Sequence, residues 1–312
     1  MKTFELAKSK FIEHNTLIIF ILMLLFSASI SDAFFTLGNI SNILRQVAPI
    51  GLISFGMLLV ILIGEIDLSV GSIVAAIGVT FALLSHLVYF PVAFLLSLFV
   101  GAMVGMVSGY LVAYQKMASF IATLAMMTIV RGLGYLLSKG APITIGSYSN
   151  DILLLGHGDI LGIPFSALIL FLVFGVMYLL LKYHVFGRML VAIGSNEEGV
   201  RLSGILVNRY KFWVFVIIAL LSALAALLMV SRTGVGTPNI GIGLELDVIA
   251  AVVIGGASLA GGKGSVLNTL LGVLILGMIG NIMNLMDITS YLQQVIKGAI
   301  ILLAVIFQKY QN

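Results

Sequence analysis

The feature that most constrains this chain is a succession of long apolar runs separated by short polar segments. A helix that crosses a bilayer needs roughly 17–25 mostly apolar residues. About ten segments reach or nearly reach that length. We therefore predict an all-α, polytopic membrane protein with about ten transmembrane helices. The predicted spans cover residues 15–31, 44–63, 69–88, 90–114, 118–138, 161–182, 211–231, 245–262, 265–285 and 290–308.

The composition supports lipid as the solvent of most of the surface. Of the 312 residues, 61% are hydrophobic and only 9% are charged, whereas soluble domains average about 25% charged residues. The longest polar segments, 139–160 and 183–210, are too short to hold a nucleotide-binding fold. A single transmembrane domain over residues 1–312 is therefore expected.

The chain lacks the residues that sulfur chemistry and metal binding usually require. There is no cysteine, and the four histidines are scattered without the spacing of a metal pair. The net charge of +4 is small, and no basic patch with interleaved aromatic residues is present. We therefore expect lipid as a partner and no nucleic acid.

The basic residues predict the orientation of the chain. Ten spans place both termini on one side, and with a cytoplasmic N-terminus eleven of the sixteen Lys and Arg residues fall inside, as the positive-inside rule requires. Two alternatives remain. A re-entrant segment 245–262 would move the C-terminus outside, and a first span cleaved as a signal peptide would leave nine spans. The outside segments carry Arg45, Lys139 and Arg232, and Arg131 and Lys297 lie within spans.

The stretch "GGASLAGGKGS", Gly255 to Ser265, resembles a phosphate-binding loop only at first sight. Such a loop reads G-x-x-x-x-G-K-[ST]. Aligned on Gly262 and Lys263, the first glycine falls at Ala257 and the hydroxyl residue falls at Gly264. Both functional positions fail, so a helix break or a turn is the better interpretation.

Two glycine-interrupted segments are alike. "IGEIDLSVGS" (63–72) and "IGGASLAGGKGS" (254–265) each join consecutive spans. Paired breaks of this kind indicate a transport pathway, and the alternative is two tight cytoplasmic turns. A separate ridge, Gly101, Gly105 and Gly109, favours close helix packing. The candidate gating glycines are Gly64, Gly71, Gly255, Gly256, Gly261, Gly262 and Gly264.

A few polar groups lie in or beside the spans. We interpret the pairs Glu65/Asp67 and Glu245/Asp247 as interfacial or helix-capping groups, with Asp67 as an N-cap-like acceptor. A proton relay is disfavoured, because the span centres are almost free of carboxylates. Asn281 and Asn284 lie three residues apart, which suits a hydrated wall or interhelical hydrogen bonds. The candidate pathway-facing groups are Asp67, Arg131, Asn281 and Asn284.

The segment from His184 to Phe212 is the most charged interior stretch. Ser195 or Asn196 can cap a helix whose first turn carries two glutamates, and Gly204 can end it. The sequence therefore predicts a short polar helix, which serves either as a solvated connector or as a docking element for another protein.

This loop resembles the coupling motif of permeases from ATP-binding-cassette (ABC) importers, in which a glutamate is followed six residues later by a glycine, here Glu198 and Gly204. "GRMLVAIGSNEEGVRLSGI", "GEIDLSVGS", "FIATLAMMTIVRGLGYLLSKGAPI", "GLELDVIAAVVIGGASLAGGKGS" and "QQVIKGAIILLAVI" are similar to the ribose-type monosaccharide permeases. The matches are ordered from about Ser41 to Phe307. One departure is Gly199, where the general motif prefers alanine.

The resemblance implies a vitamin-importer-like (type II-like) permease with ten helices, placed in a bacterial inner membrane. It implies a dimer of permeases, an ABC ATPase subunit beneath, and a soluble periplasmic or extracellular sugar-binding protein outside. The chain itself would hold no cofactor and catalyse nothing, because ATP and magnesium belong to the ATPase. A ribose-like pentose would be the cargo. The implied coupling residues are Asn196, Glu197, Glu198, Gly199, Arg201 and Gly204.

Three other functions compete with this one. An ion-coupled secondary transporter would want carboxylates at the centres of its spans. A related ABC permease could carry branched-chain amino acids. An integral membrane enzyme would need a catalytic set, and neither a histidine cluster nor a nucleophile elbow is found in the sequence.

Overall fold

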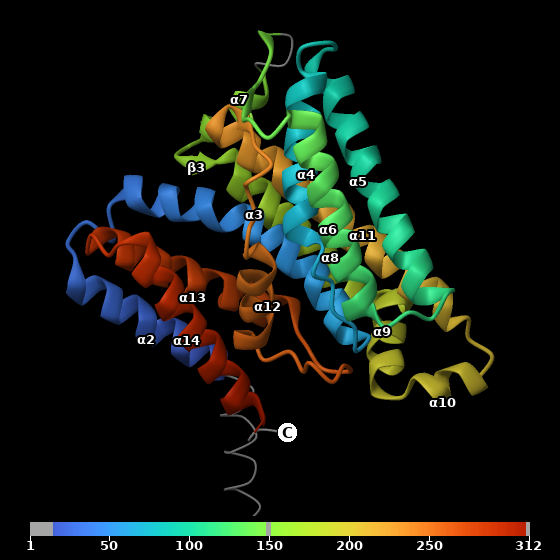
Figure 1. Cartoon of the computed structure of the whole chain (residues 1–312). Coiled ribbons are helices and arrows are strands. Elements are labelled where there is room, and N and C mark those ends of the chain that lie inside the picture. The colour runs from blue at the N-terminus through green and yellow to red at the C-terminus, as the bar shows by residue number, and fades with distance from the viewer. Residues whose placement is uncertain (1–14, 148–150, 310–312) are drawn as a thin grey trace, which may run out of the picture.

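The computed structural model describes residues 15–147 and 151–309, and Figure 1 shows them as a helical molecule. The all-α prediction is confirmed. The first half contains α2 (Asn15–Ile30), α3 (Leu37–Leu62), α4 (Val70–Leu84), α5 (Phe90–Ala113), α6 (Ser119–Ser138) and α7 (Ile152–His157). The second half contains α8 (Phe165–Tyr183), α9 (Val185–Ser195), α10 (Glu197–Leu202), α11 (Val207–Thr233), α12 (Leu244–Ile254), α13 (Val266–Leu285) and α14 (Ser290–Lys309).

Four two-residue strands complete the described elements. They are β1 (Ile143–Thr144), β2 (Asp159–Ile160), β3 (Ile163–Pro164) and β4 (Val235–Gly236). β1 pairs antiparallel with β4, and β2 pairs antiparallel with β3. We call the end of the molecule that carries α7 the α7 end and the opposite one the α10 end; they lie at the top and bottom of Figure 1.

Each predicted span contains one helix, but the helices differ in length. Six are long and apolar enough to cross a membrane by themselves: α3, α5, α6, α8, α11 and α13. The predicted span 245–262 is wrong in extent, because α12 ends at Ile254 after 11 residues. At 1.5 Å per residue it covers about 16 Å, roughly half of the hydrocarbon core.

Two helices, α4 and α12, are each preceded by a stretch of chain that is not helical. Residues 63–69 precede α4, and residues 237–243 lead from β4 to α12. The first turns of α4 and α12 meet, because Gly71 lies against the carbonyl oxygen of Gly241 and the carboxylate of Glu245. Backbone that is not helical is tolerated at membrane depth only where protein or a cavity surrounds it. These two breaks lie beside each other and are only partly buried, because Gly64, Asn239 and Ile242 are exposed.

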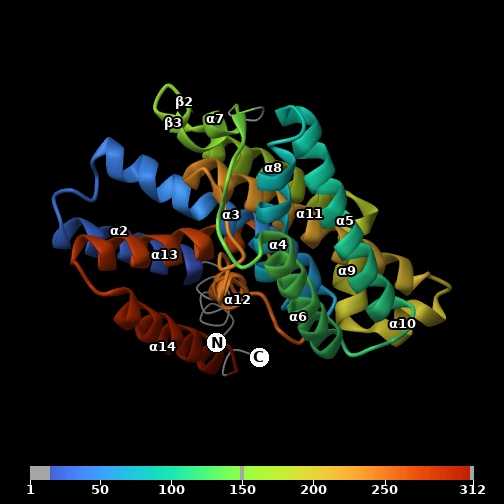
Figure 2. The same ribbon diagram turned by 45° about the horizontal axis from the view of Figure 1, so that its top comes forward.

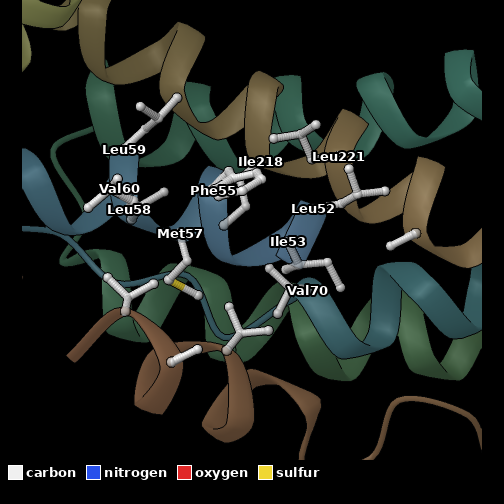
Figure 3. Packing of buried hydrophobic residues seen from close by; sticks show 14 of the residues in the cluster. Leu52, Ile53, Phe55, Met57, Leu58, Leu59, Val60, Val70, Ile218 and Leu221 are labelled. Carbon is white, nitrogen blue, oxygen red and sulfur yellow. The ribbon is translucent and has the colours of Figure 1, made fainter. Parts of the chain in front are cut away.

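Helices α3 and α11 form the centre of the molecule. In each of them, 78% of the most apolar 18-residue stretch is buried inside the protein. In α5, α6 and α8 the corresponding share is only 22–28%. Figure 3 shows side chains of α3, among them Leu52 and Phe55, beside Ile218 and Leu221 of α11. The outer helices expose leucine, phenylalanine and valine side chains, as lipid-facing helices do.

The Gly101–Gly105–Gly109 ridge packs α5 directly on α11, as predicted. A Cβ atom at Gly105 would lie 2.7 Å from the Phe215 carbonyl oxygen and 2.9 Å from the Val216 Cα. Backbone atoms cannot move aside as a side chain can, so the small residue sets the distance between the two helices.

We expect Gly105→Ile to weaken this packing. The larger side chain has to separate α5 from α11, at a cost of about 1–3 kcal/mol. Gly132 of α6 is the matched control, because no atom lies within 4 Å of the place that a Cβ would take there. In detergent, the thermal midpoint of unfolding should fall for Gly105→Ile and stay near the wild-type value for Gly132→Ile. Equal midpoints for the two variants would contradict this account of the ridge.

Candidate functional site: a surface helix joined to the spans

Helices α9 and α10 form most of the polar segment 183–210. The side-chain oxygen of Asn196 accepts a hydrogen bond of 2.9 Å from the Gly199 amide and so caps α10. The helix ends at Leu202, and Gly204 follows with a φ of 80°. The predicted short helix, its cap and its glycine end are therefore confirmed. No residue of α10 is buried.

A network of charges joins α10 to the spans. Lys211 Nζ lies 2.6 Å from Glu65 Oε1 and 2.9 Å from Glu197 Oε2. Arg201 lies 2.5 Å from Glu197 and 3.5 Å from Glu198. Lys211 thus links the first turn of α10, the start of α11 and the chain between α3 and α4.

The members of this network differ in exposure. The Lys211 and Glu65 side chains are only 11% and 18% exposed. The Glu198 side chain is 68% exposed, which makes it the acidic group of α10 that is most accessible to a partner. A polar cavity of about 250 Å³ adjoins the network and is lined in part by Lys116, Arg201 and Asn208.

A backbone junction holds α9 against two turns. The position that a Cβ of Gly194 would occupy lies against the Leu62 carbonyl oxygen and 2.5 Å from the Gly262 amide nitrogen. The Gly262 amide also donates a 2.9 Å hydrogen bond to the same carbonyl. In a phosphate-binding loop such an amide would point at the ligand; here it binds protein. Any shift of α9 must therefore move the end of α3 and the turn before α13.

The candidate gating glycines have different places in these turns. Gly64, Gly256, Gly261 and Gly262 adopt positive φ angles of 75–90°, a conformation that favours glycine. Gly255 is the C-cap of α12, Gly71 lies within α4, and Gly264 packs on the side chain of Leu58. Both glycine-interrupted segments are turns near α9, because Gly64 and Gly261 also lie close together.

Arg131 holds the break before α12. Its guanidinium donates to the carbonyl oxygens of Pro238 at 2.8 Å, Ile240 at 2.7 Å and Gly241 at 3.4 Å. The side chain is thus directed at protein backbone, where it satisfies carbonyl groups that no helix pairs.

Two of the candidate pathway groups do not line a path in this conformation. Asp67 is 1% exposed and accepts hydrogen bonds from the amide and hydroxyl of Ser69 at 2.8 and 2.6 Å. Asp67 thus acts as an acceptor just before α4, whose N-cap residue is Ser69. A role of Asp67 on a pathway stays a prediction. Asn281 is 3% exposed and exchanges two hydrogen bonds with Asn39, at 2.7 and 3.0 Å.

Asn284 does not share the environment of Asn281. It lies exposed and accepts a 2.9 Å hydrogen bond from Gln293 of α14. The two asparagines therefore do not form one hydrated wall. Hydrogen bonds between separate segments of the chain account for both of them.

An ion pair between α14 and α12 was not predicted from the sequence. Lys297 Nζ of α14 lies 2.8 Å from Asp247 Oδ2 in the first turn of α12. Asp247 lies in the first turn of α12, and the side chains of Lys297 and Asp247 are 33% and 25% exposed. A cavity of about 90 Å³ beside it is lined in part by Gln46, Gly277 and Gly280. Helix α14, at the edge of the molecule in Figure 2, packs chiefly on α12.

We expect Lys297→Met to destabilise the protein by about 2 kcal/mol, because it leaves Asp247 charged and unpaired among the helices. Adding Asp247→Asn should restore most of the thermal midpoint. If the double variant is stable but no longer transports, the pair also serves the cargo. A double variant no more stable than Lys297→Met alone would contradict the pairing as the source of stability.

The geometry defines a multi-pass helical protein with a surface helix that is joined to the ends of several spans. Residues 39–305 match the family model described as branched-chain amino acid transport system / permease component. The chain therefore belongs to this family of ABC importer permeases. It is a transmembrane transport subunit without catalysis of its own, which excludes the ion-coupled transporter and the membrane enzyme.

Three relatives match along nearly their whole length. The ribose import permease protein RbsC of Haemophilus influenzae is 43% identical over 303 residues, which cover 96% of this chain and 94% of the relative. RbsC of Bacillus subtilis is 44% identical over 298 residues, covering 94% and 91%. The L-arabinose ABC transporter permease protein AraH of Azospirillum brasilense is 39% identical over 304 residues, covering 95% and 87%. The resemblance to ribose-type permeases is confirmed. No solved structure matches the chain significantly.

Proposed function

We propose that this permease imports a monosaccharide, and that a ribose-like pentose is its cargo. The observation that carries the proposal is identity of 41–44% to ribose permeases over more than nine tenths of the chain. Branched-chain amino acids, which appear in the description of the family model, are the second candidate. They are less favoured because the full-length relatives with a named cargo carry sugars.

The proposed orientation places the α10 end in the cytoplasm of a bacterium, with the protein in its inner membrane and both termini inside. It is supported by the basic residues near the α10 end, among them Lys116, Lys182, Arg188 and Arg209. The predicted inside residues Lys2, Lys8 and Lys10 lie outside the described residues. The α7 end would then face a sugar-binding protein.

The proposed assembly contains two copies of the chain, each a single permease domain, above a pair of ATPase subunits that hold ATP and magnesium. The coupling residues would be Asn196, Glu197, Glu198, Gly199, Arg201 and Gly204. Closure of the ATPases would push α10. Two sets of contacts support this coupling. Lys211 joins α10 to the turn after α3, and Gly194 of the preceding helix α9 packs on the end of α3 and on the turn before α13.

The proposed route for the cargo passes the two broken spans. Movement of the turns at Gly64 and Gly262 would change the packing of α4 and α12, whose first turns touch. Arg131 would keep the break before α12 ordered during that change. Each partner would bias an equilibrium between two arrangements of the spans.

The cargo is tested by swapping binding proteins. The permease and its ATPase are placed in proteoliposomes with ATP on the ATPase side. A ribose-, arabinose- or leucine-binding protein is added in turn, with its labelled ligand. Ribose uptake that exceeds leucine uptake supports the proposal. Uptake of leucine alone would assign the permease to amino acids.

A further inference from the structure

An open hollow lies where α8 ends, α9 begins and α11 begins. It consists of two adjoining parts of about 300 and 380 Å³, both lined by His184. The first part is also lined by Phe186, Arg209 and Trp213, and the second by Leu179 and Tyr183. The stacked rings of Phe186 and Tyr210, 5.6 Å apart, form the wall between α9 and α11.

The rim of this hollow is positively charged. Arg209 is exposed, and its side chain makes no hydrogen bond or ion pair within the described part of the chain. His184 accepts the Phe186 amide at Nδ1, 3.1 Å away, so Nε2 carries the hydrogen and is free to donate. Lys182 Nζ donates to the Tyr178 hydroxyl and lies 5.4 Å from the Tyr183 ring, and Arg188 donates to the Tyr183 carbonyl oxygen, so both are near the rim without lining it. No acidic residue lines either part. Anions are therefore favoured at this rim.

The floor of the hollow is apolar and aromatic. Tyr183 is 62% exposed, Leu179 57% and Trp213 51%, although Trp213 belongs to the otherwise central helix α11. Tyrosine and tryptophan concentrate at the headgroup level of membranes. An exposed tryptophan one turn after an unpartnered arginine combines an acyl-chain contact with a headgroup contact.

We propose that this hollow binds an anionic phospholipid of the leaflet at the α10 end. The lipid phosphate binds Arg209 and His184, with Lys182 and Arg188 close by, and an acyl chain lies along Leu179, Tyr183 and Trp213. Basic pockets between transmembrane helices at the cytoplasmic side bind such headgroups. The lipid would fill the gap between α8, α9 and α11 and so steady the segment that carries α10. This goes beyond the proposed sugar transport and does not depend on the cargo.

The test measures lipid retention by the full chain. The permease is purified in nanodiscs of equal parts phosphatidylglycerol and phosphatidylcholine, and the lipids that stay bound are counted by native mass spectrometry. We expect phosphatidylglycerol to be enriched on the wild type. Arg209→Gln should lower that enrichment about fivefold, the value of one basic group near a membrane surface, and Arg209→Lys should keep most of it.

Lys263→Gln is the matched control, because Lys263 is an exposed lysine at the same end of the molecule and lies outside the hollow. Its phosphatidylglycerol enrichment should equal that of the wild type. Unchanged enrichment in Arg209→Gln would overturn the proposal, as would an equal loss in Lys263→Gln, which would show only a general attraction of anions. Loss of the bound lipid when the ATPase assembles would assign this surface to the ATPase and also overturn it.

Discussion

Reversing the charge at Glu198 is expected to stop sugar uptake while the partner ATPase still hydrolyses ATP. The Glu198 side chain is 68% exposed, and among the described residues its one charged contact is with Arg201 at 3.5 Å. Glu198→Arg therefore leaves the folded permease intact. In the proposed docking of α10 on the ATPase, the new cation replaces a carboxylate at the interface, which costs several kcal/mol. We expect ATP-dependent uptake in proteoliposomes to fall at least about tenfold.

Lys263→Ala provides the control for that variant. Lys263 is exposed in the glycine-rich turn between α12 and α13, which we conclude holds no phosphate. ATP hydrolysis by the complex and sugar uptake should both stay near wild-type values. Normal transport by Glu198→Arg with the ATPase bound would show that α10 is not the docking element. Lost ATP affinity in Lys263→Ala would restore the phosphate-loop interpretation.

The second large effect is expected from Gly194→Val. A side chain at this position meets the Leu62 carbonyl oxygen and the Gly262 amide, which are themselves hydrogen-bonded to each other. Since both are backbone groups, α9 has to separate from the turns, at a cost of about 2–3 kcal/mol. We expect uptake at background level and a lower thermal midpoint.

Gly199→Ala is the matched substitution in the same segment. Its Cβ would approach the Asn196 side chain, 2.9 Å from Nδ2. A small rotation of that side chain relieves the contact while Oδ1 keeps its capping bond from the Gly199 amide. Alanine also favours the helix by about 1 kcal/mol over glycine, so uptake should stay within about twofold of the wild type. Wild-type uptake and stability in Gly194→Val would contradict the proposal that the contact between α9 and the turns transmits movement of α10 to the spans.

The sequence predicted the elements that depend on local pattern. Apolar runs mark all ten spans, and the order Asn196, two glutamates and Gly204 marks the ends of α10. The length of α12 was predicted wrongly at its C-terminal end. The predicted span included residues 255–262, but the helix ends at Ile254. Gly256, Gly261 and Gly262 adopt positive φ angles there, and the Gly262 amide donates a hydrogen bond to the Leu62 carbonyl, 200 positions away along the chain.

The charge pairs were missed for a similar reason. Glu65 and Lys211 are 146 positions apart, and Asp247 and Lys297 are 50 apart, so no local spacing signals either pair. Lys297, an uncompensated basic residue inside a predicted span, was the one sequence signal that an acidic partner was needed. The hydrogen-bond partner of Asn281 is Asn39, 242 positions away along the chain, so local spacing could not predict that contact either.

The central claim, that ATP hydrolysis on a partner drives this permease, is tested most directly by sugar uptake into two sets of proteoliposomes. One set holds the chain alone under an imposed proton gradient, and the other adds the ATPase, the sugar-binding protein and ATP. We predict uptake in the second set only, and none without ATP. Gradient-driven uptake by the chain alone would contradict the claim and reduce α10 to a connector.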